Sequence, residues 1–296
     1  MKPLLFDVKS LLRNSIHIRE IKSRHLSDQF HFHNAFEIAL ILKGNGRRIV
    51  GDSVDNFTNG DLTLLAPNLP HASYSDKKYH IKETSTKVHA LVVYFQPDWI
   101  TDQHINSGDF APIKELLNQL KRGIRITGNT HTTVVNYMLK MKEADGLKSF
   151  ILLFQLLYEI ALSNDYTCLA SPGYSNTYNE SNIKKIHEVY KYVMENFTDK
   201  ISLDDVAAIA HMTPSAFCKY FKSKTHKTFT YFVNEIRIGY ACELLLNEDL
   251  DISHICFQSG FNNFTSFNKT FRHFTKVTPS AYRIKLLALR QGMNHA

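Results

Sequence analysis

Two similar segments within the last hundred residues each show the pattern of a short helix, a turn and a second helix. In the first segment Ser202 is a favourable N-cap, and Asp205 three residues later completes a capping box before an apolar run with helical spacing. A second helix is predicted to start at Thr213 and Pro214, because threonine is a good N-cap and proline is favoured at the first helical position. We expect one face of this helix to pack and the opposite, polar face to stay exposed. The packing face holds Phe217, Tyr220 and Phe221.

The second segment repeats this pattern. It begins near Asp251, turns at Gly260 and Phe261, and restarts with Asn262 as the expected cap of the next helix. We expect an aromatic stripe on that helix to be in the core, because such stripes at helical spacing are more often core than binding site. The stripe recurs at spacings of three, four and three and consists of Phe264, Phe267, Phe271 and Phe274.

One long helix is expected between the two segments. Apolar residues from Phe229 to Leu245 keep helical spacing over about twenty residues, or roughly 30 Å. One turn of B-DNA is about 34 Å long, so a rigid helix of this length can set two recognition helices in successive major grooves. Tandem helix-turn-helix units of this kind predict a DNA-binding transcription regulator.

Residues 183 to about 285 resemble the AraC/XylS family of transcription regulators. The resemblance lies in residues 213–222 (first recognition helix), 237–246 (connecting helix), 260–271 (second signature) and 278–283 (closing motif). It implies base-edge contacts by Ser215, Cys218 and Lys219 in the first helix, and by Thr265, Asn268 and Lys269 in the second. Cys256 stands where the family usually has alanine, which we expect to affect packing alone. Because Ser215 and Cys218 are short, we expect the first helix to read sequence weakly or to depend on phosphate contacts.

The polar side chains at these positions have distinct partners on DNA. Lys219 and Lys269 can donate to O6 and N7 of guanine, and Asn268 can pair with adenine. Thr265 can touch a thymine methyl group or a phosphate. Five further basic residues are expected to hold phosphates, and they are Lys222, Lys224, Lys227, Arg272 and Lys276. A single lysine is as often a solvated surface charge, so their shared face is the stronger argument. Asn262 completes the expected DNA-contacting set.

Composition supports two domains, of which the second is the more basic. The chain has 296 residues and a net charge of +7, with 15 Lys and Arg against 10 Asp and Glu from residue 183 onward. Its four cysteines show no paired spacing, so we expect reduced thiols in a cytoplasm. The apolar run at residues 3–6 is too short for a signal peptide. Residues 150–162 are too short and too interrupted to cross a membrane.

The first part of the chain reads as a β-rich domain followed by helices, so the predicted fold class is α+β. Up to about residue 110, short apolar runs alternate with turn residues, which favours a cupin-like barrel or jelly roll. The clearest strands are residues 36–42, 48–50, 62–65 and 88–95. Residues 112–162 have helical periodicity instead. The predicted domains are an effector-binding and dimerisation domain at 1–169, a linker at 170–182 and an all-α DNA-binding domain at 183–296.

Residues 151–162 form an expected helix that is apolar nearly all round. Such a helix must be buried, and packing against the barrel satisfies this requirement. The family resemblance implies a second role as a dimer interface. Both roles are compatible, because one helical layer can serve a core and a partner.

A group of histidines in the β-rich domain is the candidate ligand site. Strand alternation would place His31 and His33 on one face, and with Glu37 and Gly44 their spacing resembles the first motif of cupins, where such residues ligate a metal. Residues 67–71, which end in His71, resemble the second motif only approximately: the histidine comes one residue early and the usual asparagine is missing.

Three interpretations of His31, His33, Glu37 and His71 remain open. They bind a divalent metal, they hydrogen-bond a polar small molecule directly, or they cap strands. The family resemblance favours the second, since a cupin sensor fused to such a DNA-binding unit usually recognises a sugar or another small effector. Arg24, Asn68 and Tyr74 are further pocket candidates.

The sequence therefore predicts an effector-responsive transcription regulator without a cofactor. Its expected partners are double-stranded DNA, a small effector such as a carbohydrate, RNA polymerase and a second copy of the chain. Activation is the favoured output. The competing prediction is a metal-dependent cupin enzyme, such as an isomerase or dioxygenase, with a DNA-binding tail. A regulator whose barrel only dimerises is a third.

Overall fold

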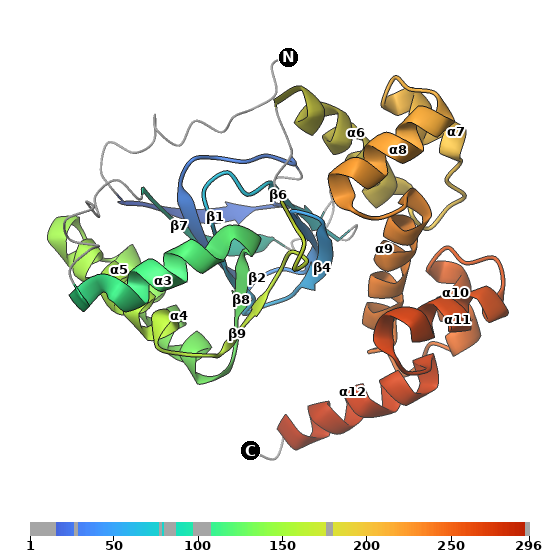
Figure 1. Ribbon diagram of the computed structural model, residues 1–296. Helices are drawn as coiled ribbons and strands as arrows, with labels where there is room; N and C mark the ends of the chain where they lie inside the picture. Colours follow the sequence, from blue (N-terminus) through green and yellow to red (C-terminus); the bar gives the residue numbers. More distant parts are fainter. Residues whose placement is uncertain are drawn as a thin grey trace. The chain divides into compact units, whose positions relative to one another are not determined.

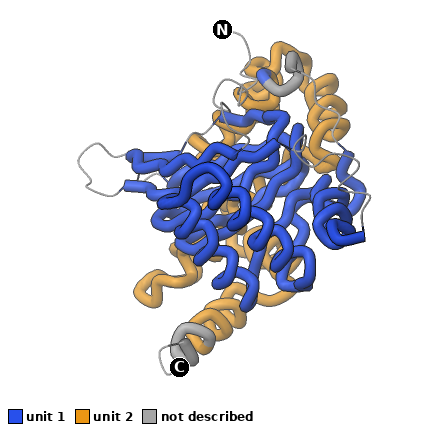
Figure 2. Tube along the Cα trace, turned by 90° about the vertical axis from the view of Figure 1, so that its left-hand side faces the viewer, with its two compact units in different colours: residues 1–184 blue, residues 185–296 orange. Residues whose placement is uncertain are grey.

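The computed structural model describes residues 16–26, 29–76, 79, 87–96, 108–175 and 180–293. The chain forms two compact units, residues 1–184 and 185–296, shown in Figures 1 and 2. The boundary between the units lies close to the predicted linker at 170–182, although the last three residues of that range already belong to a helix. The run at residues 3–6 lies outside the described residues.

The first unit contains two antiparallel sheets, so the predicted α+β class is confirmed. The six-stranded sheet has the order β1 (Ile16–Ser23), β7 (Val88–Phe95), β2 (Phe36–Lys43), β5 (Leu62–Leu65), β8 (Ile124–Ile126) and β9 (Tyr166–Cys168). The three-stranded sheet has the order β4 (Ser53–Phe57), β3 (Gly46–Val50) and β6 (His71–Ser75). All four predicted strands are present. Two further short strands were not predicted. Strand β8 lies within residues 112–162, which were expected to be helical, and β9 lies just before the predicted linker.

Alternate residues of the strands lie on opposite faces of the large sheet, and the two faces have different surroundings. Ile38 and Leu40 of β2 belong to the main hydrophobic cluster, as do Leu91 and Val93 of β7. That cluster is completed by three helices on the same side of the sheet, α3 (Ala111–Gln119), α4 (Gly128–Lys142) and α5 (Gly146–Ala161), visible in Figure 1. The 3₁₀ turns η3 (Gly108–Phe110) and η4 (Leu120–Arg122) flank α3. The alternate residues of the strands line a cavity on the opposite face, described below.

Helix α5 packs against the sheet through one face, as expected, and leaves its other face exposed in the single chain. Leu153, Leu156 and Leu157 are fully buried in the cluster shared with the sheet. The opposite face carries an apolar stripe that is exposed in the single chain, and it consists of Leu147 (75 %), Ile151 (51 %), Tyr158 (47 %) and Leu162 (61 %).

The second unit is all-helical. Its helices are α6 (Glu180–Asn196), α7 (Leu203–Ile209), α8 (Pro214–Thr225), α9 (Phe229–Leu244), α10 (Ile252–Gln258), α11 (Phe264–Thr275) and α12 (Pro279–Met293). The predicted caps of the first pair are confirmed: Ser202 accepts a hydrogen bond from Asp205 N, and Thr213 accepts one from Ala216 N. No helix of the described residues is long and apolar enough to cross a membrane.

Three sequence expectations in this unit require correction. The N-cap of α11 is Asn263, whose side chain accepts a hydrogen bond from Ser266 N, and not Asn262. The turn that contains Gly260 (φ +85°) and the buried Phe261 is one residue longer than expected. Phe264 is 44 % exposed, so the aromatic stripe does not belong entirely to the core. The connecting helix α9 has 16 residues, or about 24 Å, which is shorter than the predicted span.

The two helix pairs repeat one another closely at the end of their second helix. Thr225 donates from its hydroxyl to Phe221 O and accepts from Lys227 N, and Thr275 does the same with Phe271 O and Val277 N. The next helix begins in the same way in both copies. The side chain of Thr228 accepts a hydrogen bond from Tyr231 N at the start of α9, and that of Thr278 accepts one from Ala281 N at the start of α12. The tandem repeat inferred from sequence is therefore structural as well.

Candidate functional site

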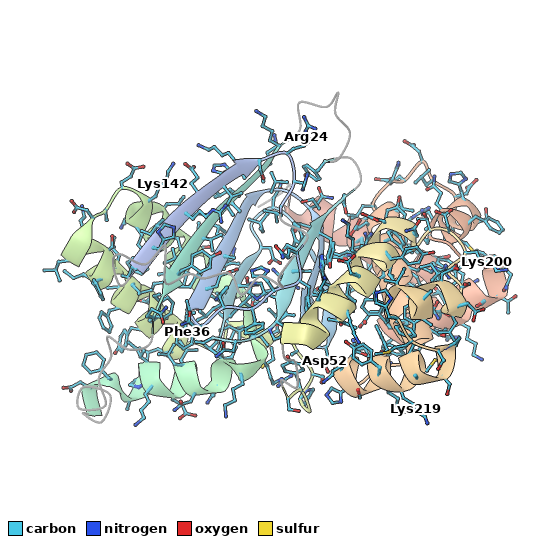
Figure 3. The ribbon with its side chains drawn as sticks, turned by 90° about the horizontal axis from the view of Figure 1, so that it is seen from above. Arg24, Phe36, Asp52, Lys142, Lys200 and Lys219 are labelled. Carbon is cyan, nitrogen blue, oxygen red and sulfur yellow. The ribbon has the colours of Figure 1, made fainter. Side chains whose placement is uncertain are left out.

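The polar faces of α8 and α11 are free in the second unit. On α8, Phe217 and Phe221 are fully buried, and Phe267 and Phe271 are the buried residues of α11. This burial leaves the residues predicted to contact DNA exposed: Ser215, Cys218, Lys219, Lys222, Asn262, Thr265, Lys269 and Arg272, with Asn268 half-buried. Figure 3 shows Lys219 extending away from the body of its helix. The structure thus places the predicted set on the exposed faces of α8 and α11, with Asn262 in the turn before α11.

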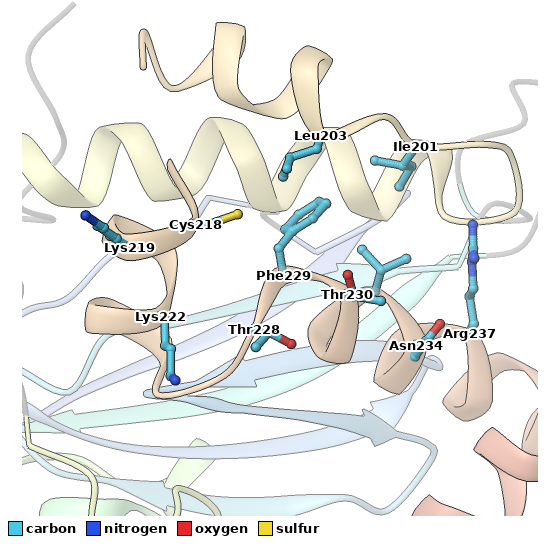
Figure 4. Close-up of a pocket in the computed structure, with 11 residues that line it drawn as sticks. Ile201, Leu203, Cys218, Lys219, Lys222, Thr228, Phe229, Thr230, Asn234 and Arg237 are labelled. Carbon is cyan, nitrogen blue, oxygen red and sulfur yellow. The ribbon is translucent and has the colours of Figure 1, made fainter. Parts of the chain in front are cut away.

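A groove of about 410 Å³ lies beside α8. Cys218, Lys219 and Lys222 form one wall, and the first turns of α9 form another, with Leu203 at the rim (Figure 4). Arg237 also lines this groove, but its guanidinium donates to Phe197 O at 2.7 Å and Asp199 O at 2.8 Å. Arg237 therefore secures the chain after α6 against α9, a positioning role that sequence analysis missed.

Two of the predicted phosphate anchors are already engaged within the chain. Lys227 Nζ donates to both carboxylate oxygens of Glu235, at 2.9 and 2.8 Å, and its side chain is only 18 % exposed. Lys276 Nζ donates to His273 O at 2.9 Å but is exposed. Lys227 is thus a structural residue, because freeing its ammonium group for DNA would leave the Glu235 carboxylate without this partner.

The structure brings the four predicted ligand residues of the first unit together. His31 and His71 form an isolated antiparallel bridge, in which His31 N donates to His71 O at 3.0 Å and His71 N donates to His31 O at 2.8 Å. His33 follows in an irregular segment and Glu37 lies on β2. The histidines therefore converge through this bridge, and not through the strand that sequence analysis expected at residues 31–33.

The three imidazole rings stand close to one another. Ring centroids are 4.4 Å apart for His31 and His71, 5.1 Å for His33 and His71, and 5.9 Å for His31 and His33. One ring nitrogen from each lies within 4.8 Å of one from each of the others. Glu37 Oε2 lies 3.0 Å from His33 Nε2 and 3.4 Å from His71 Nε2. His33, Glu37 and His71 are all buried, so most of this polar cluster is shielded from bulk solvent.

Burial and mutual charge move the titration of this cluster in opposite directions. Burial and, to a smaller extent, the neighbouring His71 lower the pKa of His31 to about 3. For His71, burial alone would lower the pKa, but the Glu37 carboxylate outweighs burial and raises it. Burial likewise would raise the pKa of Glu37, but His71 and His33 hold it well below its usual range. Burial and the Glu37 charge raise the pKa of Tyr94, so its phenol stays protonated.

The cluster borders a cavity of about 360 Å³. His31, Glu37 and His71 lie at its polar end, whereas His33 does not line it. Its other walls come from the alternate residues of β1, β2 and β7, together with the segment before β2, and the lining includes Arg19, Ile21, Leu26, Ala39, Ile41, Ala90, Val92 and Tyr94. A chamber with apolar walls and a few convergent polar groups is the usual form of a small-molecule site.

Three predicted pocket residues do not line this cavity. Arg24 is exposed and extends into solvent in Figure 3, Asn68 is exposed in a left-handed turn (φ 61°), and Tyr74 is buried on β6. Arg19 and Tyr94 line the cavity and were missed. The alternation of apolar and polar residues along β1 and β7 was the available signal, but their strand order could not be read from it.

The cluster also has the donor set of a metal site. Three imidazoles and a carboxylate are ligands that Zn²⁺ and neighbouring transition metals accept. The same groups can hydrogen-bond the hydroxyls of a polar molecule, so donor chemistry alone leaves both interpretations in place.

Comparison with known proteins gives matches to both units. Residues 14–159 match the model of an AraC-like ligand binding domain, and residues 206–285 match a helix-turn-helix domain model. The uncharacterized HTH-type transcriptional regulator YdeC of Bacillus subtilis is 22 % identical over 262 residues, which cover 86 % of this chain and 85 % of YdeC. The regulatory protein PocR of Salmonella typhimurium is 36 % identical over 99 residues, 33 % of each chain.

Among solved structures, an apo ToxT variant from Vibrio cholerae is 18 % identical, covers 92 % of this chain and 98 % of its own, and has a TM-score of 0.36. The DNA-binding domain of AdpA, solved with a target DNA, is 24 % identical and covers 36 % of this chain and 96 % of its own, with a TM-score of 0.35.

Proposed function

We propose that this chain, which belongs to the AraC family of DNA-binding transcription regulators with a ligand-binding domain, responds to a small polar molecule held in the cavity of its first unit. The observation that carries this proposal is the cavity itself, where His31, Glu37 and His71 are fixed at one end of an otherwise largely apolar chamber. A sugar or sugar derivative suits such a chamber, because its hydroxyls need fixed donors and acceptors and its ring faces can lie against apolar walls.

The second unit supplies the DNA contacts. Lys219 on α8 and Lys269 on α11 are exposed on the free faces of their helices, where they can reach base edges. Lys222 and Arg272 are exposed on the same two helices and can hold phosphates. Sequence choice would come mainly from α11, because Ser215 and Cys218 on α8 are short.

The chain would act as a homodimer. The exposed stripe of α5 places four large apolar side chains at helical spacing on a surface, from Leu147 to Leu162, and solvent exposure of such a row is unfavourable. A second copy would cover the stripe through a self-complementary interface, as most homodimers do. Two DNA-binding units then engage two half-sites, and an effector that binds one arrangement better than another shifts the balance between them.

Transcription activation through contact with RNA polymerase is the output that we propose, in the cytoplasm where reduced thiols persist. The proposal is tested by incubating the purified full-length chain with fragmented genomic DNA of its source and sequencing the retained fragments, with and without a sugar mixture. Enrichment of sites with two blocks about one helical turn apart is expected. Retention of DNA without any shared sequence under both conditions would contradict sequence-specific regulation.

A second experiment tests whether a sugar binds in the cavity. Thermal unfolding is followed for the full chain in the presence of individual sugars, because a ligand that binds the native state alone raises the Tm. Stabilisation should be lost in Tyr94→Phe or Arg19→Ala if these cavity residues contact the sugar, and kept in Arg24→Ala, whose side chain is outside the cavity.

A further inference from the structure

The three histidines of the cluster share an orientation that fixes which ring nitrogen faces the others. His31 Nδ1 donates to Gln29 O at 2.7 Å, His33 Nδ1 donates to Ala35 O at 3.0 Å, and His71 Nδ1 donates to Leu69 O at 2.8 Å. A carbonyl oxygen can only accept, so each Nδ1 carries a hydrogen. In the neutral ring the lone pair is then on Nε2. All three backbone carbonyls thus select the tautomer in which Nε2 is a ligand atom.

This orientation creates a conflict that a cation removes. The Nε2 lone pair of His33 faces Glu37 Oε2 at 3.0 Å, and two acceptors at this distance repel. His71 Nε2 is buried, lies 3.4 Å from the same oxygen, and has no hydrogen-bond partner among the described residues. Protonating both rings would place two buried positive charges on rings whose centroids are 5.1 Å apart. A single ion can satisfy both nitrogens and the carboxylate at once.

We infer that His31, His33 and His71 bind one divalent transition-metal ion through their Nε2 atoms, with the carboxylate of Glu37 as the fourth protein ligand. Zinc–nitrogen bonds of about 2.0–2.1 Å hold tetrahedral ligand atoms roughly 3.4 Å apart. The ring nitrogens already lie within 4.8 Å of one another, so each ring has to move by less than about 1 Å. Carbonyls on the outer nitrogens are the usual second layer of a histidine metal site, because they hold the rings in place.

The burial of the cluster determines which side of the ion stays open. His33 is 1 % exposed and lies behind the cavity wall, whereas His31, Glu37 and His71 line the cavity. An ion at this position would face the chamber on the side of His31, Glu37 and His71, where expansion from four to five ligands would let an oxygen of a bound molecule coordinate it. This second role, in which the ion anchors the effector, rests on the function proposed above, whereas metal binding itself does not.

The test uses the full-length chain after treatment with a chelator and its removal. Titration with Zn²⁺ in a calorimeter should give one ion per chain, and titration with Co²⁺ should give a visible absorption band that saturates at the same ratio. Mutation of a residue that only supports a metal ligand typically lowers metal affinity by about 10–100-fold. Loss of a ligand itself should cost more, so His33→Gln and His71→Gln should weaken Zn²⁺ binding by more than about 100-fold. Glu37→Gln removes the charge at nearly constant volume and should weaken binding by at least about tenfold.

His89→Gln is the matched control. His89 belongs to the same unit, and its Nε2 lies 2.7 Å from Glu20 Oε1, outside the cluster. This variant should bind Zn²⁺ as the native chain does. Circular dichroism of each variant establishes that it is folded, and Zn²⁺ should raise the Tm of the native chain and of His89→Gln but not of His71→Gln.

Two results would overturn the metal site: absence of one-to-one Zn²⁺ binding at micromolar concentrations, or equal binding by the native chain and by folded His33→Gln and His71→Gln. The regulator function has a separate readout. If a sugar raises the Tm in the presence of chelator and changes DNA retention, the proposed function stands while the metal site fails. If Zn²⁺ binds as expected but no DNA sequence is enriched, the metal site stands and the regulator function fails.

Discussion

The ring of Tyr231 in α9 lies against the ring of Phe274 in α11, with centroids 4.8 Å apart and an interplanar angle of 49°. His273 meets the same tyrosine ring edge-on at 6.0 Å. These contacts join α9, the helix that follows α8, to α11. Side-chain packing between α9 and α11 therefore helps to fix the exposed face of α11 relative to that of α8.

Replacing Tyr231 with alanine should loosen this coupling. An aromatic pair of this kind contributes about 0.5–1.5 kcal/mol beyond its buried area, so the free energy of unfolding should fall by about that amount or slightly more. Affinity for DNA that carries two binding blocks, one for α8 and one for α11, should fall more than affinity for DNA with a single block. The reason is that α11 is no longer held in a fixed position relative to α8. Fluorescence anisotropy on both DNAs measures the difference. Tyr231→Phe keeps the ring and should behave as the native chain; an equal loss on both DNAs by Tyr231→Ala would contradict the coupling.

Lys269 on α11 is expected to read a base. Lys269→Ala should lower affinity for the cognate site by about 1–3 kcal/mol while changing affinity for random DNA far less. Lys222→Ala, which removes an expected phosphate contact, should weaken both and reduce the salt slope by about one. Lys200→Ala, an exposed lysine outside the recognition helices, is the control. If Lys269→Ala weakened binding to both DNAs equally, Lys269 would be a phosphate contact instead.

The apolar stripe on α5 should determine the oligomeric state. Ile151 is 51 % exposed at the centre of the stripe, and Ile151→Glu places a charge where a partner would desolvate it. We expect a monomer by analytical ultracentrifugation at concentrations where the native chain is a dimer. The circular dichroism spectrum should match that of the native chain, which shows that the variant is folded. Asn118→Glu adds the same charge to an exposed position on α3 and should leave the dimer intact. A native chain that sediments as a monomer would rule out this interface.

Local periodicity was sufficient to predict which residues of α8 and α11 are exposed. Helices α8 and α11 bury residues four positions apart, so the exposed set follows from the sequence once the helix starts are known. The predicted cap of α11, Asn262, was wrong by one residue. The length of the preceding turn depends on the close packing of Gly260 against another segment of the chain. A Cβ at Gly260 would lie 2.5 Å from Phe197 O, a contact between distant segments that no local pattern reveals.

The sequence identified the members of the histidine cluster, but not how the fold brings them together or which other residues line the cavity. The histidines were recognised by their spacing, yet their convergence depends on the bridge between His31 and His71, forty residues apart in the chain. Tyr94 was missed because it lies opposite Glu37 in the pairing of β7 with β2. That register joins strands far apart in sequence, and alternation within each strand does not specify which strands become neighbours.

Cys218 offers a direct probe of whether the exposed face of α8 meets DNA. It is exposed on the polar face of α8, whereas Cys256 is buried and burial raises the pKa of Cys242 to about 11. At pH 8 a maleimide should therefore label Cys218 and the exposed Cys168 much faster than the other two thiols. Saturating cognate DNA should slow labelling of Cys218 at least about tenfold and leave Cys168, in the first unit, unchanged. Mass spectrometry of the labelled peptides gives both rates. Equal labelling of Cys218 with and without DNA would mean that this face of α8 does not enter the DNA groove, and DNA recognition would then rest on α11 alone.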